Sequence, residues 1–251
     1  MREGLSGSEL VARLGPHPAV RWGLELETDA GLARWFVAAC LLAPRADEEA
    51  TAAARAALAA RGLDATGALA HADPGPVSDA LRAAAWPKPE ITAARLVRAS
   101  ANLAARHRGS LARLASAADG LEELASALMT LSPGIGAATA SEFLRPLRER
   151  FSAARELPLS PAAHAAALHV GLLRDGEDEE GEPGALRAAL ARETPPPALA
   201  DVESALTRLG RAACQRGTPA RCLLGARCPA RAASPRAASP REASPRVRRA
   251  K

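Results

Sequence analysis

Residues 121–144 read LEELASALMTLSPGIGAATASEFL, and this stretch determines the fold that we expect. Apolar residues recur at helical spacing on both sides of the central SPGIG, which predicts two helices joined by a very short turn. Pro133 ends the first helix, because its ring clashes with the preceding turn and it has no N–H to donate. Gly134 and Gly136 allow backbone angles that are costly for other residues. Ile135 can then pack between the two helices.

The second helix is predicted to begin directly after this turn. Its first N–H groups and the glycine amides would then face one spot, which suits an anion and most simply a phosphate. The alternative is an ordinary helical hairpin in which the glycines only make the turn.

The order L-S-P-G-I-G-x-x-T-A between two apolar helices resembles the helix-hairpin-helix element of DNA glycosylases of the endonuclease III family. Further segments precede the hairpin in that family's order: WFVAACLLAP at 35–44, a helix at 48–61, and AWPKPEITAARLVRASANLAARHRGSLARL at 85–114. The resemblance covers residues 28–150 and continues more weakly to 228. It implies an all-α, two-lobed fold with a DNA-binding groove between the lobes.

We therefore expect an N-terminal extension at 1–27 and a glycosylase-like helical domain at 28–228, followed by a disordered basic tail at 229–251. The domain would contain the hairpin at 121–144 and a cysteine loop at 214–228. The resemblance implies that the chain is a monomer that binds double-stranded DNA. The residues expected to contact DNA are Ser132, Gly134, Ile135, Gly136, Ala137, Thr139, Arg45, Arg145 and Arg148.

Composition supports the helical reading and narrows the class of protein. Ala and Leu dominate, Tyr is absent and β-branched runs are lacking, as is typical of an all-α chain. The chain has no apolar run of membrane-spanning length and no N-terminal apolar signal, so we expect no membrane contact. Four Cys are too few for a disulfide scaffold. We expect a cytoplasmic protein, associated with the nucleoid if the source is bacterial.

The positive charge is concentrated in the tail. The whole chain carries +5, and residues 229–251 alone carry +6, which leaves −1 for residues 1–228. Residues 231–246 repeat RAASP, RAASP and REASP before a final Arg. This low-complexity segment lacks the apolar residues needed for folding and is predicted to be disordered. Its cations could add salt-dependent affinity for DNA, or the tail could merely aid solubility.

The resemblance also identifies the positions where catalytic groups would stand. Family glycosylases break the bond between base and sugar in an extruded nucleotide with a carboxylate and, in some members, a Lys. The Lys position corresponds to Ala138, and the only lysines are Lys88 and Lys251. Schiff-base lyase activity at an abasic site is therefore not expected.

The Asp position falls in LPLSP at 157–161, which contains no Asp. The candidates that remain are Glu149, Glu156 and Ser160. We interpret the two glutamates as solvated surface groups and Ser160 as a helix cap, since a neutral hydroxyl cannot balance an oxocarbenium-like charge.

Two further departures from the family pattern concern Arg45 and the cysteines. Arg45 follows the helix predicted at 31–43, where it could fill the hole left by a flipped base, contact phosphate, or face solvent. Cys214, Cys222 and Cys228 resemble the loop that binds a [4Fe–4S] cluster in many family members, but Gly225 stands where another ligand is expected. Three thiolates could hold a labile cluster or a Zn²⁺ with an outside ligand. The loop could equally be a remnant that binds nothing.

The sequence thus predicts a DNA-binding protein of base-excision-repair type. It would be either a weakly active glycosylase without a lyase step or a non-catalytic relative. The alternatives are a non-enzymatic protein that recognises structured DNA and a helical interaction protein unrelated to DNA.

Overall fold

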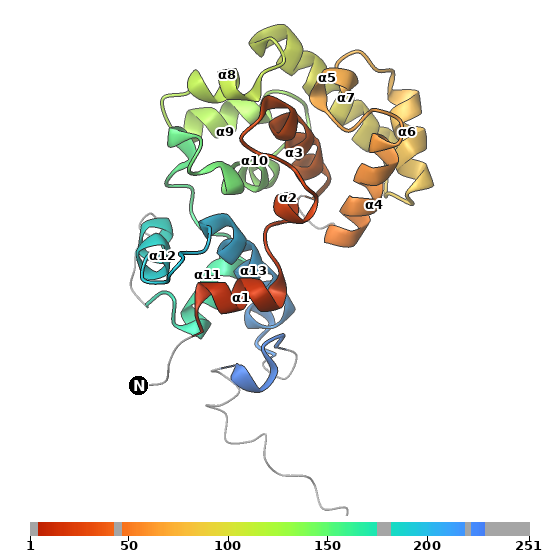
Figure 1. Cartoon of the computed structure of the whole chain (residues 1–251). Coiled ribbons are helices and arrows are strands. Elements are labelled where there is room, and N and C mark those ends of the chain that lie inside the picture. The colour runs from red at the N-terminus through yellow and green to blue at the C-terminus, as the bar shows by residue number, and fades with distance from the viewer. Residues whose placement is uncertain (1–4, 43–46, 175–181, 219–221, 229–251) are drawn as a thin grey trace, which may run out of the picture.

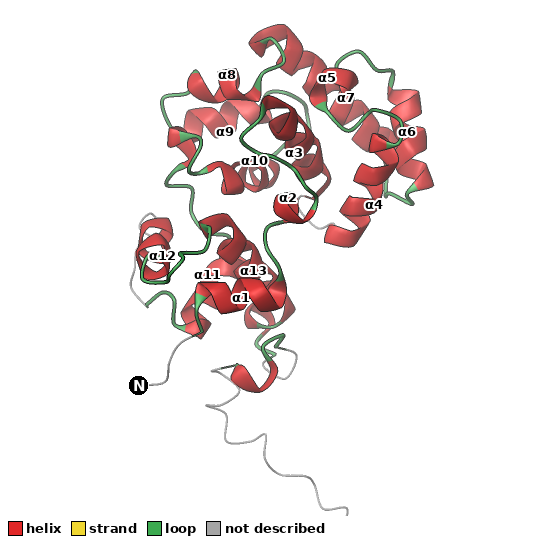
Figure 2. Ribbon diagram, viewed as in Figure 1, coloured by secondary structure: helices red, strands yellow, loops and turns green. Residues whose placement is uncertain are grey.

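The structure is a computed structural model that describes residues 5–42, 47–174, 182–218 and 222–228, and within these ranges every regular element is helical (Figures 1 and 2). The all-α prediction is confirmed for the described residues. The predictions made for Arg45 and for the tail at 229–251 fall outside these residues. No helix in the described ranges is long and apolar enough to cross a membrane.

The helices follow one another with short connections. In chain order they are α1 (Gly7–Leu14), α2 (Pro18–Arg21), α3 (Asp29–Leu42), α4 (Glu48–Ala59), α5 (Thr66–Leu69), α6 (Pro74–Ala83), α7 (Pro89–His107), α8 (Leu111–Ser116), α9 (Leu121–Met129), α10 (Ala137–Leu144), α11 (Pro161–Val170), α12 (Glu182–Leu190) and α13 (Leu199–Ala212), with 3-10 turns η1 (Arg145–Leu147), η2 (Ser152–Ala154), η3 (Cys214–Arg216) and η5 (Gly225–Arg227).

Two hydrophobic cores divide the helices into two lobes. The first core takes buried residues from Ala19 to Leu157, and the second takes Leu5, Leu10 and residues from Leu159 to Cys228. Figure 1 shows α3–α10 grouped in one lobe and α1, α11, α12 and α13 in the other. The chain passes between the lobes twice, near His17 and near Pro158, so the space between the lobes is lined by residues from distant parts of the sequence.

The N-terminal segment is part of the second lobe and not a separate extension. Leu5 and Leu10 are buried in the second core, and α1 packs against α13. The Glu193 carboxylate accepts hydrogen bonds from the Gly7 and Ser8 N–H groups, at 2.6 and 3.0 Å. A boundary at residue 27 therefore does not separate two packing units, because the second core is incomplete without α1.

The first lobe is built around α3, which is buried on nearly every side. Trp35 and Phe36 at its centre are at most 1 % exposed. The indole Nε1 of Trp35 donates a hydrogen bond to the Phe143 carbonyl of α10 at 3.0 Å, and the Phe36 ring meets the Phe143 ring edge to face. The second helix of the hairpin is thereby fixed against the most buried helix of the lobe.

The predicted hairpin is present as α9, a short turn and α10. Gly134 has φ of +89°, a value that favours glycine, and Ile135 is only 5 % exposed and belongs to the first core. The Asn102 side-chain amide donates to the Leu131 carbonyl at 2.8 Å and holds the turn against α7. The turn is therefore held in place by the burial of Ile135 and by the hydrogen bond from Asn102 of α7.

A close approach of α13 to α11 gives a direct test of the second core. A Cβ atom added to Gly210 would lie 1.9 Å from the Ala162 carbonyl oxygen, whereas one added to Gly184 of α12 would meet nothing within 4 Å. We predict that Gly210→Ala lowers the free energy of unfolding by about 1–3 kcal/mol, because the two helices must move apart. The control Gly184→Ala should leave it unchanged or raise it by up to about 1 kcal/mol. Urea unfolding measures both, and equal stabilities would contradict the packing described.

Candidate functional site

The N-terminus of α10 is exposed and has no side-chain cap. Gly136, Ala137 and Ala138 are all exposed, and no side chain among the described residues accepts a hydrogen bond from the first turn of this helix. By contrast, the Ser160 hydroxyl caps α11, where it accepts from the Ala163 N–H at 3.1 Å. The first N–H groups of α10 are therefore open to an acceptor from outside the chain.

Arg95 lies beside this turn, although no sequence motif identifies it. A Cβ atom added to Gly134 would lie 2.8 Å from Arg95 Nε, so the guanidinium is in close contact with the turn. The Nε atom is buried and has no hydrogen-bond partner. A guanidinium placed next to open backbone N–H groups favours an anion such as a phosphate.

Three of the hairpin residues expected to contact DNA have buried side chains. Ser132, Ile135 and Thr139 are 2 %, 5 % and 6 % exposed. Their side chains stabilise the hairpin from within, and any contact of this turn with a ligand would come from the exposed main chain at Gly134, Gly136 and Ala137.

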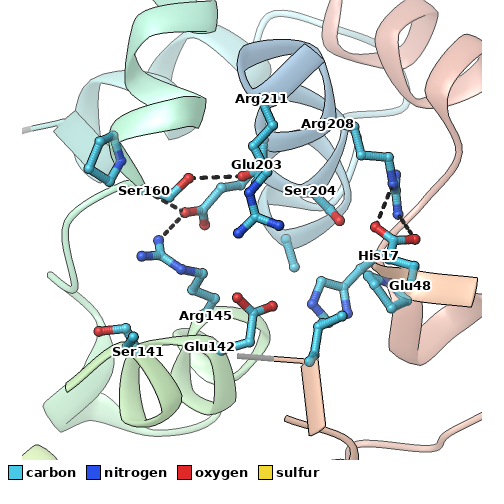
Figure 3. Close-up of a pocket in the computed structure, with 16 residues that line it drawn as sticks. His17, Glu48, Ser141, Glu142, Arg145, Ser160, Glu203, Ser204, Arg208 and Arg211 are labelled. Carbon is cyan, nitrogen blue, oxygen red and sulfur yellow. Dashed lines mark hydrogen bonds and ion pairs between the residues drawn. The ribbon is translucent and has the colours of Figure 1, made fainter. Parts of the chain in front are cut away.

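A pocket of about 260 Å³ lies between the two lobes, close to this turn (Figure 3). It brings together Ala138 of α10, the position that the resemblance assigns to the catalytic Lys, and Ser160, the N-cap of α11 in the segment 157–161 where the resemblance places the Asp. Its other lining residues are His17, Pro18, Leu42, Glu48, Ser141, Glu142, Arg145, Pro161, Ala200, Glu203, Ser204, Thr207, Arg208 and Arg211.

Glu203 is buried on the α13 wall of the pocket, where it forms ion pairs with both Arg145 and Arg148. Its Oε1 also accepts a hydrogen bond from the Ser160 N–H at 3.2 Å. Burial alone would raise the pKa of Glu203, but the two arginines and these hydrogen bonds hold that pKa below its usual range. The carboxylate therefore stays ionised and joins the end of the hairpin to the second lobe.

These ion pairs correct the roles expected for Arg148 and Arg145. The Arg148 side chain is 1 % exposed, and its guanidinium also donates to the Leu157 carbonyl at 2.8 and 3.0 Å. It has no surface to offer to DNA, and we remove it from the DNA-binding set. Arg145 is 16 % exposed and engaged by Glu203, so it shapes the pocket wall rather than the outer surface.

The sequence-derived catalytic candidates occupy different places. Glu149 and Glu156 are 67 % and 60 % exposed, pair with Arg187, and do not line the pocket. Ser160 does line it, but its hydroxyl caps α11 and lies 2.9 Å from the Thr207 hydroxyl. The geometry therefore agrees with solvated glutamates and a capping serine.

Five charged residues of the pocket were not identified from the sequence: Glu48, Glu142, Glu203, Arg208 and Arg211. Figure 3 shows Glu142 on α10 and Arg211 on α13 directed into the pocket from opposite walls. Glu142 stands one helical turn after Ala138, and Arg211 stands on the same face of α13 as Glu203, so helical spacing could have indicated both.

His17 closes one side of the pocket as a packing residue. Its Nδ1 accepts from the Ala19 N–H at 3.2 Å, and its ring packs edge-on against Trp35. Burial lowers the pKa of the His17 imidazole to about 3, so the ring is neutral at neutral pH. A neutral ring is what the apolar contact with Trp35 requires.

The three cysteines of the C-terminal loop lie around one small cavity of about 90 Å³, together with His169 and Thr218. The fourth cysteine, Cys40, is buried in the other core. A four-thiolate cluster therefore does not fit the described residues, and none of their His, Cys, Asp or Glu side chains forms a ready metal-binding group. Burial raises the pKa of the Cys222 thiol to about 11, so this thiol stays protonated at neutral pH.

Comparisons with protein-family models, with curated proteins and with solved structures give no match to this chain. The function must therefore be argued from the turn at Gly136 and from the pocket behind it.

The buried ion pairs yield a stability prediction. Replacing Glu203 with Ala leaves the fully buried Arg148 without its counter-charge, so we expect the free energy of unfolding to fall by about 3–5 kcal/mol. The control Glu149→Ala removes an exposed partner of Arg187 and should cost less than about 1 kcal/mol. If urea unfolding gave losses of similar size for both variants, Glu203 would not be the buried link between the lobes.

His17 yields a prediction of pH dependence. Because its pKa in the folded chain is about 3, below the ordinary 6.5, the unfolded chain takes up a proton first as the pH falls. Stability is then lost below pH 6.5 at up to about 1.4 kcal/mol per pH unit. We expect His17→Asn, which keeps a capping side chain, to be less stable at neutral pH but to lose less on acidification. Parallel stability curves for the two proteins between pH 7 and pH 4 would refute this role of burial.

Proposed function

We propose that this chain is a DNA-binding protein of base-excision-repair type with a glycosylase-like fold. It would hold duplex DNA at the hairpin turn and admit one extruded nucleotide to the pocket between the lobes. The observation that carries the proposal is the position of α10. Its exposed N-terminus is at Gly136, and the same helix lines the pocket through Ala138, Ser141 and Glu142.

The length of α10 explains why the two features would act on neighbouring parts of one strand. Eight residues span about 12 Å, so a phosphate bound at the turn would leave the adjacent nucleotide within reach of the pocket. Open backbone N–H groups bind phosphate oxygens without reading the base sequence. The folded part is nearly neutral overall, so the positive charge of Arg95 beside the turn would supply local attraction for a phosphate.

The positions of Ala138 and Ser160 limit the chemistry. A Schiff base needs an amine, and Ala138 supplies none, so strand cleavage through a lysine adduct is excluded from the proposal. Hydrolytic release of a base is the reaction left for an enzyme of this type. The second candidate is binding of damaged or distorted DNA without catalysis, which is favoured by the neutral Ser160 and by the pairing of Glu203 with two arginines.

The exposed turn permits a variant that separates binding from folding. Gly136 is the N-cap residue of α10 in extended backbone, and a Cβ atom there would meet nothing within 4 Å. Gly136→Asp should therefore cap α10 and preserve or raise stability. Its carboxylate would occupy the open N–H groups and repel phosphate.

We predict that Gly136→Asp in the full-length chain binds a duplex containing an abasic-site analogue at least about tenfold more weakly than the unaltered chain. The matched control is Gly120→Asp, which makes the same change at the open N-cap of α9. Fluorescence anisotropy at moderate salt measures binding, and thermal unfolding checks the fold. Equal affinity for the two variants would mean that the hairpin turn does not hold the DNA.

A further inference from the structure

The inter-lobe pocket is lined by three carboxylates, of which two are neutralised. Glu48 pairs with Arg208 at 2.8 Å and with Arg21 at 2.5 Å. Glu203 is held by the buried arginines described above. Glu142 has neither an ion pair nor a hydrogen bond to any other described residue.

Arg211 is the corresponding unpaired cation. It lines the same pocket from α13 and has no ion pair or hydrogen bond with a described residue, although its charge acts on Glu142 across the pocket. Glu142 is half-buried without a partner, which is costly for folding unless a ligand uses its carboxylate, whereas Arg211 is exposed and keeps its guanidinium available to a ligand. Such a pair is therefore a candidate for the residues that do the chemistry.

We infer that Glu142 is the catalytic carboxylate of this pocket, in the hydrolysis of the bond between base and sugar in an extruded nucleotide, and that Arg211 binds a phosphate beside that nucleotide. This inference rests on the proposed function. It moves the chemistry from the position of Ser160, where the family resemblance would place it, to one helical turn beyond Ala138 on α10.

The step balances with water as the only co-reactant. Water attacks C1′ of the deoxyribose, and Glu142 accepts the proton that the water loses as the C1′–O bond forms. The C1′–N bond breaks, and its electron pair leaves with the base. Glu142 then returns the proton to the base nitrogen, so the products are the free base and an abasic sugar. The negative charge of Glu142 also stabilises the positive charge that develops on the sugar.

The groups around Glu142 shift the pKa of its carboxyl and so affect its strength as a proton acceptor. Burial raises the pKa of its carboxyl, while Arg145 and Arg211 act to lower it and Glu203 and Glu48 act to raise it. His17 faces the same cavity as a neutral ring. A carboxylate whose pKa lies above the ordinary range is a stronger base, and at neutral pH it can both take and return a proton.

The test uses the full-length chain and duplexes that each carry one deaminated, oxidised or N-methylated base, with release of the free base followed by mass spectrometry. We expect base release from at least one duplex, and we expect Glu142→Gln to slow it at least about 100-fold. Glu142→Gln should bind the abasic-site duplex as tightly as the unaltered chain and unfold at the same temperature or higher, because it removes an unpaired carboxylate. The matched control Glu122→Gln changes an exposed glutamate of α9 and should release base normally.

The possible outcomes separate this inference from the proposed function. Undiminished base release by Glu142→Gln, or a lower unfolding temperature with weaker DNA binding, would overturn the catalytic role. Binding of the abasic-site duplex without base release from any duplex would also overturn it, while leaving the DNA-binding proposal in place. Failure of the unaltered chain to bind the duplex would remove both. Arg211→Gln should weaken binding and reduce its salt dependence, as expected for a lost phosphate contact.

Discussion

The ion pairs of Glu203 with Arg145 and Arg148 are the interaction on which the arrangement of the two lobes depends. They join the end of the hairpin in the first lobe to α13 in the second, at a place where all three side chains are largely shielded from water. Charges in such a place are tolerated only when each has its partner and its remaining hydrogen bonds. Here the Leu157 carbonyl and the Ser160 N–H complete the set. These directional contacts restrict the positions of the side chains in the pocket wall more than apolar packing alone would.

This constraint also decides which pocket residues are free to act. Because Glu203 is fully engaged, it can orient the segment that begins α11 but cannot take up a proton at neutral pH. Glu48 is similarly engaged by Arg208. The groups that keep unused charge are Glu142 and Arg211, and the helix that carries Glu142 also presents the open amides at Gly136. Binding at the turn and chemistry in the pocket would therefore be coupled through one rigid helix that is itself fixed to Trp35.

Much of this fold follows from local sequence signals. The hairpin and the packing of Ile135 between its helices were predicted because Pro, Gly and helical periodicity act over a few residues. The assignment of α1 to the second core could not be predicted, since it depends on Glu193 and on α13. Arg148 was misread as a DNA contact for the same reason: its partner Glu203 lies more than fifty residues away. Glu142 was missed because the pocket that it lines forms only where α10 packs near α13, and its helical spacing from Ala138 does not by itself show that pocket.

The most direct test of this account is to follow the backbone amide signals of the full-length chain by NMR during titration with a duplex that contains an abasic-site analogue. We expect the largest chemical-shift changes at the amides of Gly134, Gly136, Ala137 and Ala138, with smaller changes along α10 and around Arg211. Changes confined to the basic tail at 229–251, with the hairpin amides unaffected, would contradict it. In that case the chain would bind DNA through charge alone, and the pocket between the lobes would need another explanation.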